Sequence, residues 1–297
     1  MARQAERSSP PLSVVTGANS GVGLEVAAGL RSAGHDVIMA CRSAERCAAA
    51  AAALDARGLP GSSQCRALDL NDYQSVRRFA ASLSADRPLV TLVNNAGVMG
   101  VPDGHMQPNH LGPFLLTRLL LPLMAAGGRV VTVASEAHRR APALRISAAA
   151  DGRRQLEGGD PAWWYASYGQ SKLANVLMTQ GLSQQLQQRR SGVTASSVSP
   201  GRVATNIFLG VPGLLQPALR WLAAAAFQTP AQGARTVLHA ALAPELSGRH
   251  ELYLHNCKPC AASAAARDPQ LAAELWQFSC QETGLSAAED AALWPPH

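Results

Sequence analysis

The sequence has little charge and almost no lysine. Charged residues make up only 15% of its 297 residues, and Lys172 and Lys258 are the two lysines among 26 basic residues. Aromatic residues are also scarce, at 5%, and no uninterrupted apolar run approaches the ~18 residues of a membrane span. The arginines are scattered, without the basic and aromatic stripe of a nucleic-acid groove. We therefore expect no transmembrane span, no nucleic-acid partner and a solvated surface, despite a net charge of +6.

The sequence also lacks signals for export, disulfides or metals. The opening stretch MARQAERSSPPLS has no apolar core of a secretory signal, which favours a cytoplasmic location. Free thiols are expected, because the chain is long and Cys41, Cys47 and Cys65 fall inside apparent strand or helix patterns. Cys257 and Cys260 have metal-like spacing, but no second CxxC accompanies them, so we expect no metal site.

Apolar runs alternate with helical patterns along most of the chain. Alternation of this kind predicts βαβ units and a mainly parallel sheet with helices on both faces. We expect a single α/β domain with a doubly wound, Rossmann-like fold, because no repeat or linker stands out. The predicted strands cover 12–16, 36–40, 64–68, 91–95, 129–135 and 193–199, and the predicted helices lie near 21–33, 44–56, 72–84, 109–124 and 167–187.

The ends of the chain and the loops are predicted from weaker signals. A flexible tail is expected over 1–11, the folded domain over 12–285 and a C-terminal tail over 286–297. The stretch 145–160 is the most loop-like part of the sequence. Capping patterns predict helix starts at three positions, Asn71, Thr229 and Asp268.

A glycine-rich segment, TGANSGVG (16–23), joins the first predicted strand to the first helix. Glycines permit a tight turn and a close backbone approach, and the N–H groups at a helix start favour a phosphate. The segment therefore predicts a dinucleotide site, although a plain strand-to-helix turn would use glycine as well. The expected contacts come from Gly17, Asn19, Ser20, Gly21, Val22 and Gly23.

The end of the second predicted strand has no carboxylate. An NAD-preferring site would place Asp or Glu here for the ribose hydroxyls, but the sequence reads MACRS. Arg42 can pair bidentately with a 2′-phosphate instead. The sequence thus predicts NADP(H) as the cofactor, with ordinary surface charge as the other interpretation of Arg42.

Lys172 follows Tyr168 by four residues, about one helical turn, so the two side chains share a helix face. An adjacent ammonium favours the phenolate and would lower the pKa of Tyr168 from ~10. Ser135 would hold the substrate oxygen while Tyr168 exchanges the proton. Tyr165 has Gly169 at the same spacing, so Tyr168 is the better candidate. Purely structural roles are the alternative for all three residues.

Taken together, these segments resemble the short-chain dehydrogenase/reductase family over roughly residues 12–285. The segments ACRS, SKLANVL and DPQLAAELWQFSCQETGL look most like the retinol-dehydrogenase and protochlorophyllide-reductase branch, including relatives that act on polyprenol-type lipids. The matching stretches run in family order: TGANSGVG (16–23), DL (69–70), NNAG (94–97), NHLGPFLLT (109–117), RVVTVAS (129–135), YGQSK (168–172) and SPGRVATN (199–206).

The resemblance implies a catalytic set of Asn109, Ser135, Tyr168 and Lys172, in which Asn109 would hold a water that links Lys172 to solvent. Tyr168 and Lys172 would also contact the cofactor, and the branch usually uses NADP(H). The other implied contacts are the adenine at Asp69 and Leu70, the adenosine ribose at Asn95, Ala96 and Gly97, and the nicotinamide amide and pyrophosphate at Pro200, Gly201, Val203 and Thr205.

Two features depart from the family pattern. Gly97 and Asn109 are 12 positions apart, about half the spacing in relatives. Pro108 disfavours helical structure on its N-terminal side, so Asn109 is expected at a helix start. The sequence also shows no apolar N-terminal anchor like that of many retinol dehydrogenases. A lipid substrate is therefore expected to arrive from solution or through a peripheral membrane contact.

The stretch 208–227, FLGVPGLLQPALRWLAAAAF, is apolar with little charge. In this family the region is a substrate lid, here about 203–228, and its composition suggests a retinoid, steroid or polyprenol-like ligand. Helical packing or a subunit interface, and hence a homo-oligomer, is the alternative. We predict an NADP(H)-dependent oxidoreductase that interconverts an alcohol with an aldehyde or ketone. A catalytically weak NADP-binding regulatory or scaffolding protein, and a double-bond reductase, are the other hypotheses.

Overall fold

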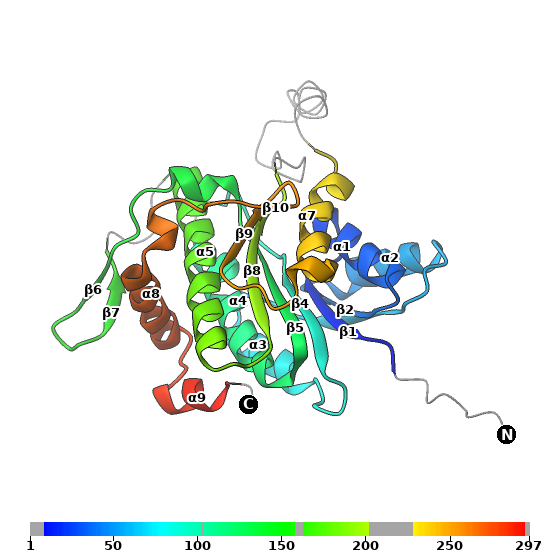
Figure 1. The fold of residues 1–297 in the computed structure, drawn as a ribbon, viewed down its shortest axis with the longest axis horizontal. Coiled ribbons are helices and arrows are strands. Elements are labelled where there is room, and N and C mark those ends of the chain that lie inside the picture. The colour runs from blue at the N-terminus through cyan, green and yellow to red at the C-terminus, as the bar shows by residue number, and fades with distance from the viewer. Residues whose placement is uncertain (1–8, 102–103, 158–162, 202–227, 295–297) are drawn as a thin grey trace.

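The computed structural model describes residues 9–101, 104–157, 163–201 and 228–294. An eight-stranded sheet lies at the centre, with the strand order β10-β9-β8-β5-β4-β1-β2-β3 (Figure 1). All neighbouring strands pair in parallel except β10 and β9. The chain order reverses between β1 and β4, which is where open parallel sheets bind ligands. The predicted fold class is confirmed.

The six predicted strands are present, with ends shifted by a few residues. Strands covered on both faces are typically apolar, and the sequence pattern found LSVVT (12–16) and LVTLVN (89–94) in this way, whereas TASSVS (194–199) contains three serines. Two short strands extend the sheet beyond β8 and were not predicted. The strands of this sheet are β1 (Leu12–Thr16), β2 (Asp36–Cys41), β3 (Ser63–Ala67), β4 (Leu89–Asn94), β5 (Met124–Val133), β8 (Thr194–Ser199), β9 (Leu252–His255) and β10 (Lys258–Pro259).

Helices cover both faces of the sheet (Figure 1). One face carries α1 (Gly21–Ser32), α2 (Ala44–Asp55) and α7 (Pro230–Leu242). The other carries α3 (Tyr73–Ala81), α4 (Gly112–Leu120) and α5 (Trp164–Gln188), with α8 (Pro269–Glu282) packed on α5. The predicted caps Thr229 and Asp268 are confirmed. The cap at Asn71 is wrong, because Asp72 accepts the Gln74 N–H and caps α3.

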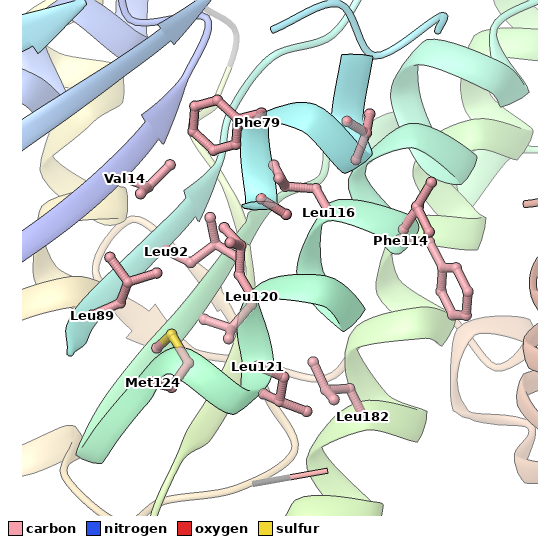
Figure 2. Packing of buried hydrophobic residues seen from close by; sticks show 14 of the residues in the cluster. Val14, Phe79, Leu89, Leu92, Phe114, Leu116, Leu120, Leu121, Met124 and Leu182 are labelled. Carbon is pink, nitrogen blue, oxygen red and sulfur yellow. The ribbon is translucent and has the colours of Figure 1, made fainter. Parts of the chain in front are cut away.

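Figure 2 shows the core layer between the sheet and the helices α3, α4 and α5. Leu116 and Leu120 of α4 pack with Val14 of β1 and Leu92 of β4, and all four are buried. Val15, the next residue in β1, belongs to the opposite layer, under α1. Alternate residues of each strand thus face different helices, which fixes the register in which the strand ends meet.

The stretch expected to be a loop contains a small hairpin. β6 (Ile146–Ala148) and β7 (Arg154–Leu156) pair in antiparallel fashion as a separate two-stranded sheet. The loop prediction is wrong for these residues, because strands of three residues give too short a pattern to recognise in the sequence.

The expectation that the cysteines are all free is also wrong. Cys47 of α2 and Cys65 of β3 form a disulfide, with their Cα atoms 5.9 Å apart. The sequence placed each cysteine inside an element but could not show that α2 packs over the edge strand β3. The other four cysteines, Cys41, Cys257, Cys260 and Cys280, are free thiols.

Residues expected to form a C-terminal tail are folded up to Trp294. After the N-cap Ser286, α9 (Ala287–Ala292) carries Asp290, whose carboxylate accepts a hydrogen bond from Arg118 Nε at 2.7 Å. Arg118 is 1% exposed, and its guanidinium carbon lies 4.0 Å from the centre of the Trp294 ring. The buried Arg118 cation on α4 therefore binds both the Asp290 carboxylate and the face of the Trp294 ring, and these contacts hold the C-terminal residues against α4.

We expect Asp290→Ala to lower the free energy of unfolding by about 3 kcal/mol, because it leaves the Arg118 guanidinium buried without its counter-charge. Urea denaturation would measure the loss. The double variant Arg118→Met with Asp290→Ala is the control, since removing both charges should restore part of the stability. Exposed surface pairs contribute less than about 1 kcal/mol. A change of less than that in the free energy of unfolding of Asp290→Ala would contradict this role.

Among the residues that the structure describes, no helix is both long enough and apolar enough to cross a membrane. The predicted lid over about 203–228 lies outside the described residues, apart from Gln228.

Candidate active site

Most of the residues predicted for the site lie at one edge of the sheet. Because β1, β2, β4, β5 and β8 run in parallel, their carboxyl ends meet there. Gly17, Arg42, Asn95, Ser135 and Pro200 each follow the end of one of these strands within a residue or two. The fold thus brings together segments that are far apart in the sequence.

The glycine-rich segment makes the tight turn that its sequence predicts. Gly17 and Gly21 have φ values of +64° and +57°, a region that favours glycine. A Cβ atom on Gly23 would lie 2.4 Å from both Asn95 Nδ2 and the Gly17 carbonyl oxygen. Ser20 is the N-cap of α1 and makes no side-chain capping hydrogen bond within the described chain. The first turn of α1 thus leaves backbone N–H groups for an anion.

Thr16 fixes the glycine-rich segment to the strand beside it. Its hydroxyl accepts hydrogen bonds from the backbone N–H of Asn95 at 3.0 Å and of Ala96 at 2.9 Å. Asn95 Nδ2 donates in return to the Thr16 carbonyl oxygen at 2.9 Å. The sequence analysis gave Thr16 no role, although it opens the motif, because its partners come from a segment about 80 positions later.

The predicted adenosine end is formed by Arg42, Asp69 and Leu70. Arg42 is exposed after β2, and its guanidinium makes no hydrogen bond to any residue that the structure describes. Asp69 Oδ1 accepts the backbone N–H of Asn71 at 3.0 Å, so this carboxylate also stabilises its own turn. Leu70 is buried against Gly112, where a Cβ atom would lie 2.3 Å from the Leu70 carbonyl oxygen.

The catalytic candidates converge where α5 crosses the end of β5. Ser135 follows β5, and its side chain lies near the Tyr168 hydroxyl on α5, close enough to oppose the rise of the phenol pKa. Lys172 Nζ donates to the Val133 carbonyl oxygen at 3.0 Å and lies 5.6 Å from the centre of the Tyr168 ring. A Cβ atom on Gly97 would be 3.3 Å from Lys172 Nζ, so a side chain there would crowd this ammonium.

Burial dominates the electrostatics of this pair. It raises the pKa of Tyr168 to about 12, against the opposing effect of the nearby Ser135 side chain. It lowers the pKa of Lys172, which is 3% exposed, to about 8. The predicted lowering of the Tyr168 pKa is therefore wrong for this arrangement, because the loss of water outweighs an ammonium that is directed to the Val133 carbonyl.

Asn109 lies near the start of the helical layer, as predicted, but the helical turn already includes Gln107, before Pro108. It lies in a short π-helical turn, η1 (Gln107–Leu111), that leads directly into α4. Its Oδ1 accepts the Val98 N–H at 2.7 Å, and its Nδ2 donates to the Val98 carbonyl at 3.0 Å and to Ser171 Oγ at 3.0 Å. The amide thus ties the shortened segment after Gly97 to α5, and its role in holding a water stays a prediction.

The remaining predicted contacts follow β8. Gly201 has a φ of +83°, and its N–H donates to Ser199 Oγ at 3.4 Å, which turns the chain directly after Pro200. Val203 and Thr205 lie outside the described residues. In the described part of the chain, no group of His, Cys, Asp and Glu side chains is arranged to hold a metal ion.

Comparison with known sequences places this geometry among oxidoreductases. The family model for short chain dehydrogenases matches residues 12–149. Dehydrogenase/reductase SDR family member 13 of Bos taurus is 40% identical over 292 residues, covering 94% of this chain and 74% of that protein. Retinol dehydrogenase 12 of Mus musculus is 38% identical, covering 92% and 86% of the two chains, and polyprenol dehydrogenase of Danio rerio is 36% identical, covering 92% and 87%.

Solved structures agree with the fold. A crystal structure of an uncharacterised protein from Mycobacterium paratuberculosis has a TM-score of 0.70 at 33% identity, covering 93% of this chain and 95% of the other. A short chain dehydrogenase from Burkholderia cenocepacia in complex with NADP has a TM-score of 0.63 at 25% identity, covering 82% and 95%.

Proposed function

The chain belongs to the short-chain dehydrogenase/reductase family, in its retinol dehydrogenase-like branch, and from this premise we propose an NADP(H)-dependent enzyme that interconverts an alcohol with an aldehyde or ketone. The observation that carries the proposal is the convergence of Ser135, Tyr168 and Lys172 at the carboxyl edge of the sheet. A general acid, a hydrogen-bond partner for the substrate oxygen and a buried cation are what such a reaction needs from the protein.

The residues at this edge fit a dinucleotide. Gly17, Gly23 and Gly97 leave space where a side chain would clash or crowd its neighbours, and the start of α1 presents backbone N–H groups. Arg42 extends into solvent after β2, at the position where a 2′-phosphate is expected. When bound, the nicotinamide supplies or accepts the hydride at the carbon of the reacting alcohol or carbonyl. The NADP complex of a 25% identical relative supports the same choice of cofactor.

The protonation state of Tyr168 suits carbonyl reduction. With a pKa of about 12, the phenol carries its proton at neutral pH and can donate it to the oxygen of a carbonyl that Ser135 holds. Lys172, with a pKa of about 8, exchanges its proton far more readily near neutral pH. We infer that Lys172 supplies the proton that restores Tyr168 after each turnover.

A lipophilic substrate is part of the proposal. Trp163 and Trp164 are the exposed large apolar side chains of the described chain, at 64% and 39% exposure, and they stand at the start of α5, one turn before Tyr168. Aromatic side chains at the entrance of a site bind apolar ligands well. The names of the relatives, retinol dehydrogenase and polyprenol dehydrogenase, point to the same chemical class.

The test is NADPH oxidation by the purified protein with a panel of carbonyls. The panel would contain a retinoid aldehyde, a steroid ketone and straight-chain aldehydes of increasing length. We expect oxidation that depends on the carbonyl and rises with chain length, since each buried CH₂ contributes about 0.8 kcal/mol. Absence of turnover with every member, in both directions, would overturn the proposal, and retained NADPH binding would then favour a regulatory protein.

Replacement of Arg42 should change the cofactor preference. We expect Arg42→Ala to reduce the ratio of kcat/KM for NADPH to that for NADH by about 10- to 100-fold, because a charged hydrogen bond contributes about 1.5–3 kcal/mol. Steady-state rates with both cofactors measure this ratio. Arg249→Ala is the matched control, since Arg249 is equally exposed but lies before β9, at the amino edge of the sheet. An unchanged ratio would show that Arg42 is ordinary surface charge.

A further inference from the structure

Glu136 comes directly after Ser135, and three side chains gather around its carboxylate. Oε1 accepts a hydrogen bond from the Tyr253 hydroxyl, and Oε2 accepts one from Arg139 Nε at 2.8 Å. His255 Nδ1 lies 3.8 Å from Oε1. Tyr253 and His255 both belong to β9. A strand near the far edge of the sheet therefore holds Glu136, the residue after the predicted catalytic serine.

Tyr253 has the burial and position of a fixed group. It is 2% exposed, and burial beside the Glu136 carboxylate raises its pKa, so the hydroxyl remains a donor. The side chain of Ser199, the last residue of β8, lies near the same hydroxyl and acts to lower its pKa. Ser199 in turn accepts the N–H of Gly201, so one phenol lies between the segments after β5 and β8.

His138 fixes the backbone of the serine. Its Nδ1 lies 2.7 Å from the Ser135 carbonyl oxygen, and its Nε2 lies 3.1 Å from the Ser263 backbone nitrogen. A carbonyl only accepts and an amide only donates, so His138 is the neutral tautomer with its proton on Nδ1. Its ring packs edge-on against Tyr253, with 5.0 Å between the ring centres. The Ser135 carbonyl and the next side chain are thus both held through contacts with Tyr253.

We propose that Tyr253 is a positioning residue for the reaction: through Glu136 and Ser199 it holds the Ser135 turn and the Pro200–Gly201 segment in a fixed relative position. The inference rests on the proposed function, because these two segments are where the substrate oxygen and the nicotinamide amide are expected. Small displacements of groups that must meet in the transition state are costly, up to about 100-fold in rate for roughly 1 Å. Removing one hydroxyl that hydrogen-bonds with Glu136 and lies near Ser199 should therefore affect turnover more than stability.

The test compares Tyr253→Phe with the wild type and with Tyr73→Phe. The control removes the hydroxyl of a partly buried tyrosine whose side-chain partner is Gln107 Oε1 at 2.9 Å. We expect Tyr253→Phe to lower kcat at least about tenfold with KM for the carbonyl changed less than threefold, and Tyr73→Phe to lower neither. A kcat within twofold of the wild type, or an equal loss in both variants, would overturn the inference.

Hydrogen exchange provides a readout that does not depend on activity. The Ser135 turn contains two bonded amides, Ala137 N–H to Ser135 Oγ at 3.2 Å and His138 N–H to the Ser135 carbonyl at 3.1 Å. In Tyr253→Phe these amides should exchange at least about tenfold faster, while those of β1 should not change. Unchanged exchange would refute the positioning role even if the wild type reduced no carbonyl. Full activity of Tyr168→Phe would refute the proposed function and leave the exchange result valid.

Discussion

Tyr168→Phe should lower kcat for carbonyl reduction by about 100- to 10,000-fold, the range associated with loss of a positioned general acid. The variant keeps the ring that lies 5.6 Å from Lys172 Nζ and removes only the hydroxyl that lies near Ser135. NADPH binding should therefore persist while turnover is lost. Single-turnover rates of NADPH oxidation, with binding measured by NADPH fluorescence, would separate the two effects.

Tyr165→Phe is the matched control for this experiment. Tyr165 lies on the same helix, three positions before Tyr168, and its ring packs against Trp163 and Trp164. Its hydroxyl has no part in the proposed proton transfer, so we expect a rate within about threefold of the wild type. If Tyr165→Phe were inactive and Tyr168→Phe fully active, the catalytic assignment would belong to the other tyrosine.

Lys172→Met should have two opposite effects, a large loss of activity and a gain in stability. The lysine is 3% exposed, and no carboxylate among the described residues pairs with it. A pKa that falls from 10.5 to about 8 corresponds to about 3 kcal/mol of unfavourable charging on folding. Methionine fills a similar volume without that cost, so we expect the free energy of unfolding to rise by about 1–3 kcal/mol at pH 6.5. Carbonyl reduction should fall at least about 100-fold.

The gain in stability should depend on pH with a defined sign. Below pH 8 Lys172 is charged in both the folded and the unfolded chain, so the wild type bears the full cost. Between pH 8 and about 10.4 the folded chain releases the proton that the unfolded chain still binds, and wild-type stability rises with pH. The advantage of Lys172→Met should therefore shrink across this window. Urea denaturation without cofactor, at pH 6.5 and pH 9.5, would measure it.

Lys258→Met provides the control for both effects, because Lys258 is exposed on the short strand β10. The same chemical change there should alter neither activity nor the pH dependence of stability. A Lys172→Met protein that is less stable than the wild type at pH 6.5 would show that the buried ammonium is stabilising, and the proposed cost of its burial would be wrong.

Local signals in the sequence were sufficient to predict the fold, the glycine-rich turn and the pairing of Tyr168 with Lys172. The central strands β1 and β4 are largely apolar runs, and Gly17 and Gly21 mark positions where the backbone requires positive φ. Tyr168 and Lys172 could be paired because both lie on one helix, where spacing determines the shared face. Each of these inferences needs only a few neighbouring residues.

Contacts between distant segments could not be predicted in the same way. The partners of Thr16, the disulfide between α2 and β3, and the bond from Tyr253 to Glu136 all depend on how the elements pack. The error over the Tyr168 pKa has the same origin. Helical spacing indicates that an ammonium is near a phenol, but the degree of burial and the direction of the ammonium are properties of the folded chain.

The pairing of Arg118 with Asp290 also constrains the order of events during synthesis. Arg118 is synthesised more than 170 residues before Asp290. Until α9 has emerged from the ribosome, α4 therefore carries a guanidinium without its counter-charge. N-terminal segments generally collapse first, as translation proceeds. For this protein, the layer formed by α3, α4 and α5 gains the Arg118–Asp290 pair only after residue 290 has been synthesised, so an intermediate that lacks Asp290 leaves the Arg118 guanidinium without its carboxylate.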